Sequence, residues 1–168
     1  MVTPLIRGFD MNGSWRTAWQ QQDIVIFRND AEVDRIRATA IARVVLVHRG
    51  QGTSPGDLVH AVVVLEDECL ILPADTGFAG RVLFERQPFW NDRACVFWVR
   101  QSQAPLPWKL RRGPWFLRSA TAAFVRMPRA DLGALMEGWP LQGPQTWEQR
   151  KWSQIENSRP FADARARA

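Results

Sequence analysis

A chain of 168 residues has the length of one ordinary globular domain. Its 46% hydrophobic and 23% charged residues exclude a disordered chain, and its two cysteines exclude a disulfide framework. Apolar runs such as residues 61–65 are far shorter than the roughly 20 residues that cross a bilayer, and residues 1–13 lack the apolar stretch of a signal peptide. We therefore predict a non-transmembrane protein in the reducing cytoplasm.

Arginine supplies nearly all of the positive charge. Only Lys109 and Lys151 among the 22 basic residues are lysines, and the chain has nine Trp but no Tyr. Codon bias in a GC-rich genome explains this usage as well as selection for planar, stacking cations does. Residues 81–129 hold ten basic residues against two acidic ones, so this segment carries +8 while the rest of the chain carries −3. This asymmetry points to an anionic partner.

The first half of the chain is dominated by strand patterns. Residues 1–22, with Gly, Pro, Gln and two Trp, indicate an arm that packs by its aromatic side chains or is partly loose. A short strand is expected over residues 23–28. Residues 33–37 alternate as a second strand, although a turn of helix begun at Asp30 explains them equally well. The clearest strand covers residues 41–49.

Two further strands follow and complete a meander. Residues 50–57 have the Gly, Ser and Pro of a loop, residues 58–65 form an apolar strand, and residues 66–68 are an acidic turn before a strand at 69–72. Short loops between successive strands predict an antiparallel meander. Strands that are apolar on both faces must be covered on both faces. We expect a helix on one face and, on the other, a second sheet, the curled end of the same sheet or a partner subunit.

The second half mixes short helices and strands. Spaced apolar residues predict a short helix over 78–89, and residues 95–99 read as a strand. Shorter strands are predicted at 109–112, 115–118 and 122–126. Pro128 opens an amphipathic helix to about Gly138, and Thr146 with Gln149 forms a capping box for a last helix ending near Asn157.

These elements predict an α+β fold, a curled antiparallel sheet with a few short helices, the clearest near the C-terminus. The predicted organisation is an arm over 1–22, one α+β domain over 23–142, and a helix with a tail over 143–168. The order of early hairpin, curled sheet and late helix over residues 23–139 resembles a pleckstrin-homology-like half-barrel. The resemblance includes no residue motif, so it identifies no binding residue in this sequence. The helix expected at 78–89 departs from the half-barrel pattern.

No catalytic or metal-binding constellation stands out in the sequence, and no cofactor is predicted. His48, His60, Cys69 and Cys95 lack the close spacing with which metal ligands occur in pairs. If Arg49 pairs with Leu58, the two histidines lie on opposite faces of their hairpin. Both cysteines belong to apolar strands, which suits an inert buried thiol. The acidic turn at 66–68 is typical of a solvated hairpin end.

The basic segment carries the functional hypothesis, because Trp interleaved with Arg is typical of sites for anionic ligands and of protein-interface hot spots. The predicted anion- or partner-binding residues are Arg93, Arg100, Trp108, Lys109, Arg111, Arg112, Trp115 and Arg118. A non-enzymatic module is favoured, with a protein, lipid headgroup or nucleic acid as its partner. The alternatives are an enzyme acting on an anionic small molecule through His48 or His60, and a structural subunit of a homo-oligomer or larger assembly.

Overall fold

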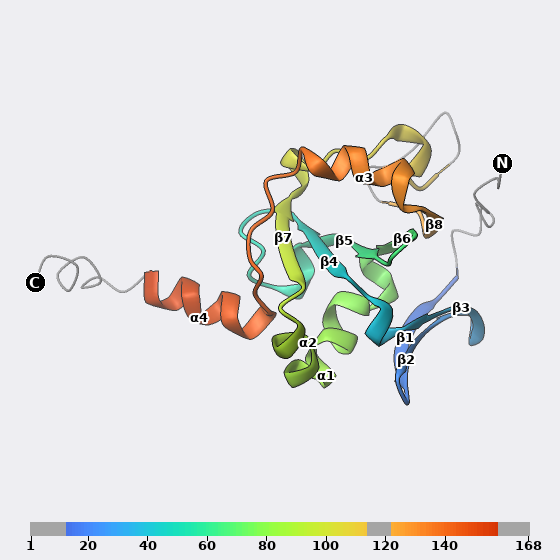
Figure 1. Cartoon of the computed structure of the whole chain (residues 1–168), viewed down its shortest axis with the longest axis horizontal. Helices are drawn as coiled ribbons and strands as arrows, with labels where there is room; N and C mark the ends of the chain where they lie inside the picture. Colours follow the sequence, from blue (N-terminus) through green and yellow to red (C-terminus); the bar gives the residue numbers. More distant parts are fainter. Residues whose placement is uncertain (1–12, 114–121, 158–168) are drawn as a thin grey trace, which may run out of the picture.

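The computed structural model describes residues 13–113 and 122–157, which fold into two β-sheets with short helices around them (Figure 1). This confirms the predicted α+β class. The strands are β1 (Trp15–Gln20), β2 (Asp23–Arg28), β3 (Ala31–Arg37), β4 (Arg43–His48), β5 (Leu58–Val64), β6 (Glu68–Pro73), β7 (Val96–Arg100) and β8 (Val125–Pro128). The α-helices are α1 (Leu83–Glu85), α2 (Gln87–Arg93), α3 (Arg129–Glu137) and α4 (Trp147–Asn157).

The smaller sheet is an antiparallel meander of β1, β2 and β3. Its second turn is Asn29-Asp30, and both residues have the positive φ angles that a tight two-residue hairpin loop requires. β1 lies within the segment for which the sequence indicated only an arm. Its Trp15 and Trp19 pack against the core, which agrees with the alternative of an arm that packs by its aromatic side chains.

The larger sheet has the strand order β7-β4-β5-β6-β8. The predicted antiparallel meander is confirmed in β4, β5 and β6. β7 lies parallel to β4, so the expectation of a purely antiparallel sheet was wrong at this edge. A parallel neighbour needs a crossover connection, which α1 and α2 supply. The two sheets do not close into a barrel, and the resemblance to a pleckstrin-homology-like half-barrel is not confirmed.

Both faces of the larger sheet are buried, as the two-sided apolar strands predicted. We call the two groups of buried side chains the first and second core clusters. Val44, Leu46 and Val63 belong to the first cluster, whereas their neighbours Val45 and Val62 belong to the second. The alternation follows from the pleat, which sends successive side chains to opposite faces.

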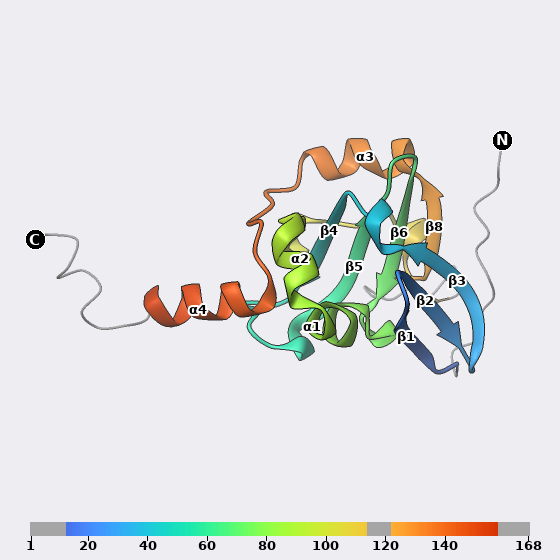
Figure 2. The same ribbon diagram turned by 60° about the horizontal axis from the view of Figure 1, so that its bottom comes forward.

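Different elements cover the two faces (Figures 1 and 2). The smaller sheet, α1, α2 and the π-helical turn before α1 cover the first face, and they contribute the first core cluster's Ile24, Trp90 and Phe78. On the second face, α3 and an irregular stretch around residues 104–110 contribute Leu132 and Leu106. The expected pair of covers, a helix and a second sheet, is therefore present.

The helices differ from the sequence pattern in detail. The expected helix over 78–89 becomes a π-helical turn (Phe78–Val82), then α1 and α2, with a break at Arg86. The break suits Pro88, which has no N–H to donate and is tolerated in a first helical turn. α3 matches the expected helix closely.

α4 begins as predicted, but its capping box is half formed. The backbone N–H of Thr146 donates to the side-chain oxygen of Gln149 at 2.9 Å. The Thr146 hydroxyl has no hydrogen-bond partner within the described residues. Trp147 is buried and packs edge-on to Trp98, whereas Trp152 is 55% exposed on the part of α4 that projects from the body (Figure 1).

Of the short strands predicted after residue 108, one is mostly replaced by a turn and another is shifted along the chain. A 3-10 turn, Trp108–Leu110, replaces most of the strand expected at 109–112, and only Arg111 keeps a single β-bridge, to Ala122. The strand expected at 115–118 lies outside the described residues. β8 replaces the one expected at 122–126 and begins slightly later, at Val125.

Because both faces of the larger sheet are buried, truncating a core side chain on either face should lower the free energy of unfolding. Leu46→Ala, in the first core cluster, and Ile71→Ala, in the second, should each lower the free energy of unfolding by about 2–5 kcal/mol, because each leaves a cavity in a packed layer. Glu137→Ala, on the exposed side of α3, should change it by less than about 0.5 kcal/mol. Urea unfolding measures all three. A small effect for either core variant would mean that one face of the sheet is not packed.

Candidate functional site

Residues 100–112, which we call the covering segment, cross the second face of the larger sheet at the end where β7 stops. Ala104, Leu106 and Leu110 are buried in the second core cluster and fix this segment to the sheet. The positions between them stay at least partly exposed, including the half-exposed Trp108 and the exposed Lys109. The segment contains no acidic residue. It therefore presents cationic and aromatic side chains from a firmly anchored backbone.

A cavity of about 370 Å³ lies between the covering segment and β5. The lining residues are His60, Gln101, Ser102, Ala104, Pro105, Leu106 and Arg111. The volume is at the lower end of the range for small-molecule sites. Polar and apolar groups share the lining, so the cavity suits a ligand with both kinds of surface.

His60 is the unusual group in this lining. It is 2% exposed, and neither ring nitrogen has a hydrogen-bond partner within the described residues. Burial lowers the pKa of His60 from 6.5 to about 4, so the ring is neutral near pH 7. A neutral imidazole has one N–H donor and one nitrogen acceptor. Both groups are unused within the described residues, and the ring lies in the wall of the cavity.

Arg111 brings positive charge to the same cavity. Its Nε–H donates to the carbonyl of Leu106 at 3.2 Å, and its backbone N–H donates to the carbonyl of Trp108 at 3.2 Å. These contacts fix the backbone of Arg111 and the Nε end of its guanidinium group. The two terminal nitrogens have no partner in the part of the chain that the structure describes. A guanidinium held in this way can donate two parallel hydrogen bonds to a carboxylate or phosphate.

The eight residues predicted to bind a partner do not form one surface. Arg100, Trp108, Lys109, Arg111 and Arg112 all belong to the covering segment, and of these only Arg111 lines the cavity. Trp115 and Arg118 lie outside the described residues. Arg93 lies apart, at the end of α2, where it donates to the carbonyl of Ile41 and packs over the ring of Phe89.

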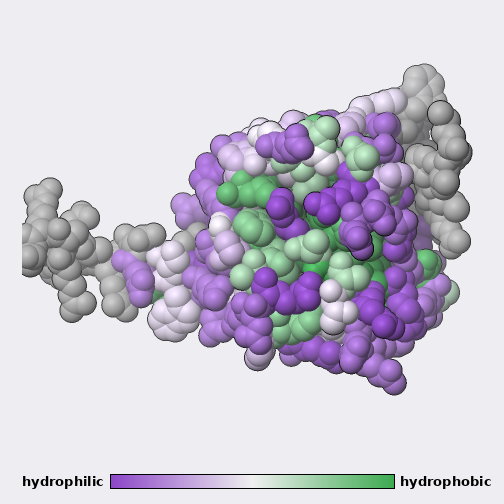
Figure 3. All heavy atoms as spheres, viewed as in Figure 1, coloured by the Kyte–Doolittle hydropathy of each residue, from purple (hydrophilic) through white to green (hydrophobic). Residues whose placement is uncertain are grey.

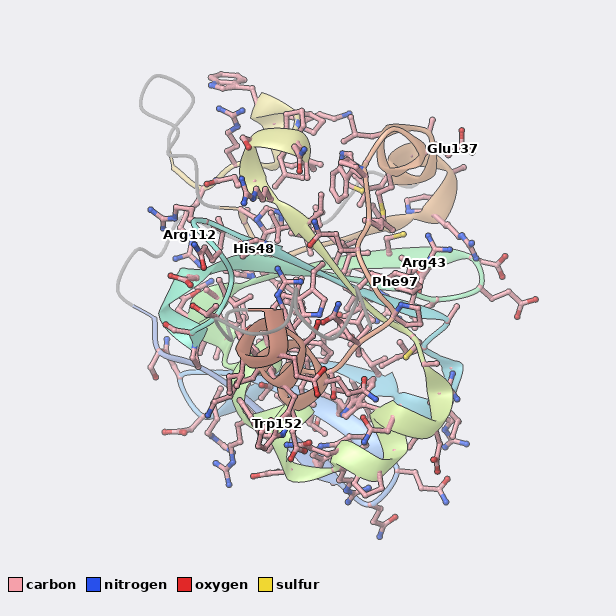
Figure 4. The ribbon with its side chains drawn as sticks, turned by 90° about the vertical axis from the view of Figure 1, so that its left-hand side faces the viewer. Arg43, His48, Phe97, Arg112, Glu137 and Trp152 are labelled. Atoms are coloured by element: carbon pink, nitrogen blue, oxygen red, sulfur yellow. The ribbon has the colours of Figure 1, made fainter. Side chains whose placement is uncertain are left out.

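The register of the sheet separates Arg93 from the rest. β4 and β7 run parallel, with His48 opposite Arg100 at one end, whereas Ile41 precedes the other end of β4. Five residues of strand length correspond to roughly 17 Å. Figure 4 shows the same separation, with His48 and Arg112 on one side and Arg43 on the other.

Several arginines of the basic segment are neutralised by carboxylates. Arg112 pairs with Asp75 at 3.1 Å, and Arg81 pairs with Glu85. Arg126 reaches both Asp34 at 2.6 Å and Glu68 at 2.8 Å, which ties the two sheets together. The net charge of residues 81–129 therefore overstates the charge available to a partner.

A second cationic cluster lies on the other face of the sheet. Arg150 of α4 is only 7% exposed and stacks over the ring of Trp98 at 4.6 Å. It donates to the carbonyl of Gln51 at 3.1 Å, and its Nη2 lies 3.5 Å from the Nε2 of His48. Burial and the nearby charges of Arg150 and Arg100 lower the pKa of His48. These contacts use the guanidinium to attach α4 to the domain.

The two histidines face opposite ways, although Leu58 pairs with His48 and not with Arg49, the pairing for which the sequence predicted this arrangement. The regular register of β4 and β5 places Val47 opposite His60, and a bulge after Val47 then places His48 opposite Leu58. His48 consequently packs with Trp98 on the first face, and His60 enters the second. The sequence analysis named His60 only for the enzyme alternative and left it out of the predicted binding residues. The available signal was a lone polar residue inside a strand that is otherwise apolar on both faces.

Neither cysteine has the properties of a nucleophile. Cys69 and Cys95 are buried and free, and burial raises the pKa of both thiols. Both therefore remain protonated near pH 7, and the reactive species is the thiolate. Within residues 13–113 and 122–157, no group of three or more His, Cys, Asp and Glu side chains could hold a metal ion.

No protein-family model, curated protein or solved structure matches this chain. Among the described residues, no helix combines the length and the apolar character that a membrane crossing requires. The function must therefore be argued from the cavity and its surroundings.

The state of His60 predicts how stability depends on pH. The unfolded chain binds a proton on this residue near pH 6.5, whereas the folded chain binds it only near pH 4. Stability should therefore fall as the pH drops through this window, and His60 should account for roughly 3 kcal/mol of the loss.

His60→Leu isolates this contribution. The variant replaces a buried, unpartnered polar ring by an apolar group of similar size, so it should be at least as stable as the wild type at pH 7. Its loss of stability between pH 6.5 and 4 should be smaller than that of the wild type by roughly 3 kcal/mol. Urea unfolding across this pH range measures both quantities. Parallel curves for the two proteins would show that His60 titrates normally.

Proposed function

We propose that this domain is a non-enzymatic binding module that takes up a small anionic molecule in the cavity beneath the covering segment. One observation carries the proposal: a buried imidazole without a partner and a guanidinium with unused donors line the same 370 Å³ space. Buried polar groups normally have partners, and an exception is explained by strain or function. A bound ligand supplies the missing contacts.

The electrostatics support an anion. The covering segment has four basic residues and no acidic one, and the only carboxylate paired with it among the described residues is Asp75, on Arg112. Arg111 is held by backbone carbonyls, which leave its charge uncompensated. An anion near Arg111 also gains from the exposed charges of Arg100 and Lys109.

Binding is better supported than catalysis by a histidine. A general base works best when its pKa is near the working pH. The pKa of His60 is about 4, and burial lowers that of His48 as well. Neither ring contacts a carboxylate within the described residues that could raise its basicity. The hypothesis of an enzyme acting on a small anion thus stays second to that of a binding module.

The hypothesis of an assembly subunit rests on a different surface. Trp152 of α4, labelled in Figure 4, is 55% exposed, and Ile155 of the same helix is exposed as well. Hydrophobic residues also gather at the centre of the face shown in Figure 3, within a hydrophilic rim. Sedimentation as a strict monomer at high concentration would end this hypothesis without affecting the cavity.

Calorimetric titration with inorganic phosphate and with lactate, at constant ionic strength, tests the binding proposal. The wild type should bind at least one of them saturably. Arg111→Gln should weaken that binding by about tenfold or more, because the variant loses a charge-assisted hydrogen bond in the cavity. Arg43→Gln is the matched control, since it removes the same charge about four strand residues, or roughly 13 Å, from the register of His60.

Equal weakening by Arg111→Gln and Arg43→Gln would indicate a general effect of net charge and would contradict the proposal. Binding of a single-stranded oligonucleotide or of phosphatidylserine vesicles, with no binding of either small anion, would instead identify a macromolecular partner. Nucleic-acid binding of that kind should weaken steeply as salt is raised. The cytoplasmic location likewise stays a prediction that fractionation of the source cells can check.

A further inference from the structure

We propose that the ligand of this cavity is a small hydroxylated anion, with a hydroxyl group hydrogen-bonded to His60 and a carboxylate or phosphate on the same molecule paired with Arg111. This inference rests on the proposed function and specifies its ligand. Its basis is the difference between the two recognition groups that line one cavity.

His60 selects a neutral polar group. Its ring is buried within a strand whose neighbouring residues are apolar, and its two nitrogens have no partner among the described residues. A carboxylate or phosphate brought against this uncharged ring would be desolvated without a countercharge. A hydroxyl can donate to the unprotonated nitrogen or accept from the N–H, so it satisfies either orientation of the ring.

Arg111 selects the charged group. It is half-buried, and the Nε contact to the Leu106 carbonyl fixes the plane in which the terminal nitrogens are presented. The fork of a guanidinium matches the paired oxygens of a carboxylate or phosphate. Because both residues line one cavity, a single small molecule can contact both.

The remaining lining residues suit a carbon skeleton that carries hydroxyl groups. Gln101 and Ser102 add polar side chains from the short 3-10 turn after β7, whereas Ala104, Pro105 and Leu106 add apolar surface. Sugars and hydroxy acids have this division, with hydroxyl groups at their edges and C–H groups on their faces. A volume of about 370 Å³ limits the ligand to a small molecule.

Matched pairs of probes test the inference. Lactate and propionate differ by one hydroxyl, as do the pairs formed by longer hydroxy acids and their deoxy analogues. Glycerol 3-phosphate and propyl phosphate form a phosphate pair, which differs by two hydroxyls. The wild type should bind the hydroxylated member about tenfold more tightly in at least one pair, and the pair that binds identifies the anionic group.

The variants assign each part of the ligand to a residue. His60→Leu should abolish the preference for the hydroxylated probe, while binding of the deoxy probe changes little. His60→Gln, which keeps a donor and an acceptor, should retain part of the preference. Arg111→Gln should weaken both members of a pair by the same factor, and Arg43→Gln should alter neither. Thermal unfolding verifies that each variant is folded.

The outcomes separate the inference from the proposed function. If both members of each pair bind equally, His60→Leu has no effect and Arg111→Gln weakens both, the anion-binding function stands and the role of the hydroxyl is overturned. If none of the four probes binds the wild type, the small-anion function fails and the inference fails with it. A preference that survives in His60→Leu overturns the assignment of the hydroxyl to His60.

Discussion

The structure depends on one constraint, which is that the central strands of the larger sheet are apolar on both faces. Val44 to Val47 and the whole of β5 are buried, so water must be excluded from each side. The smaller sheet and α1–α2 cover one side, and α3 with the covering segment covers the other. The chain therefore surrounds its own sheet, and the elements outside it are placed by the need to bury these two faces.

The two covers differ in a way that creates the candidate site. The first is built from regular elements with large rings, among them Trp90 and Phe78, which fill space efficiently. The second is partly irregular, and short turns anchored by Ala104, Leu106 and Leu110 leave a cavity above β5. His60 lies under this irregular cover. An unpartnered ring at such a position carries an energetic cost that a bound polar group removes.

Arginine serves several purposes in this molecule, and only one of them concerns the proposed binding. Arg126 links the sheets through Asp34 and Glu68, and Arg150 attaches α4 by stacking on Trp98. Arg86 donates to the carbonyl of Gln21 and packs on Trp19. Arg111 differs because, among the described residues, its guanidinium is held only through Nε and its terminal nitrogens face no carboxylate. The high arginine content is thus largely structural, which weakens total charge as a guide to function.

The sequence by itself determined the meander of β4, β5 and β6, the burial of both its faces, and helices α3 and α4, because periodicity and turn residues act over short distances. It also located the basic covering segment. Tertiary structure alone decided the parallel pairing of β7, the bulge that places His48 opposite Leu58, and which arginines meet carboxylates. Those features depend on contacts between residues far apart in the chain. The site follows from them, since His60 and Arg111 share a cavity only after the covering segment has folded over β5.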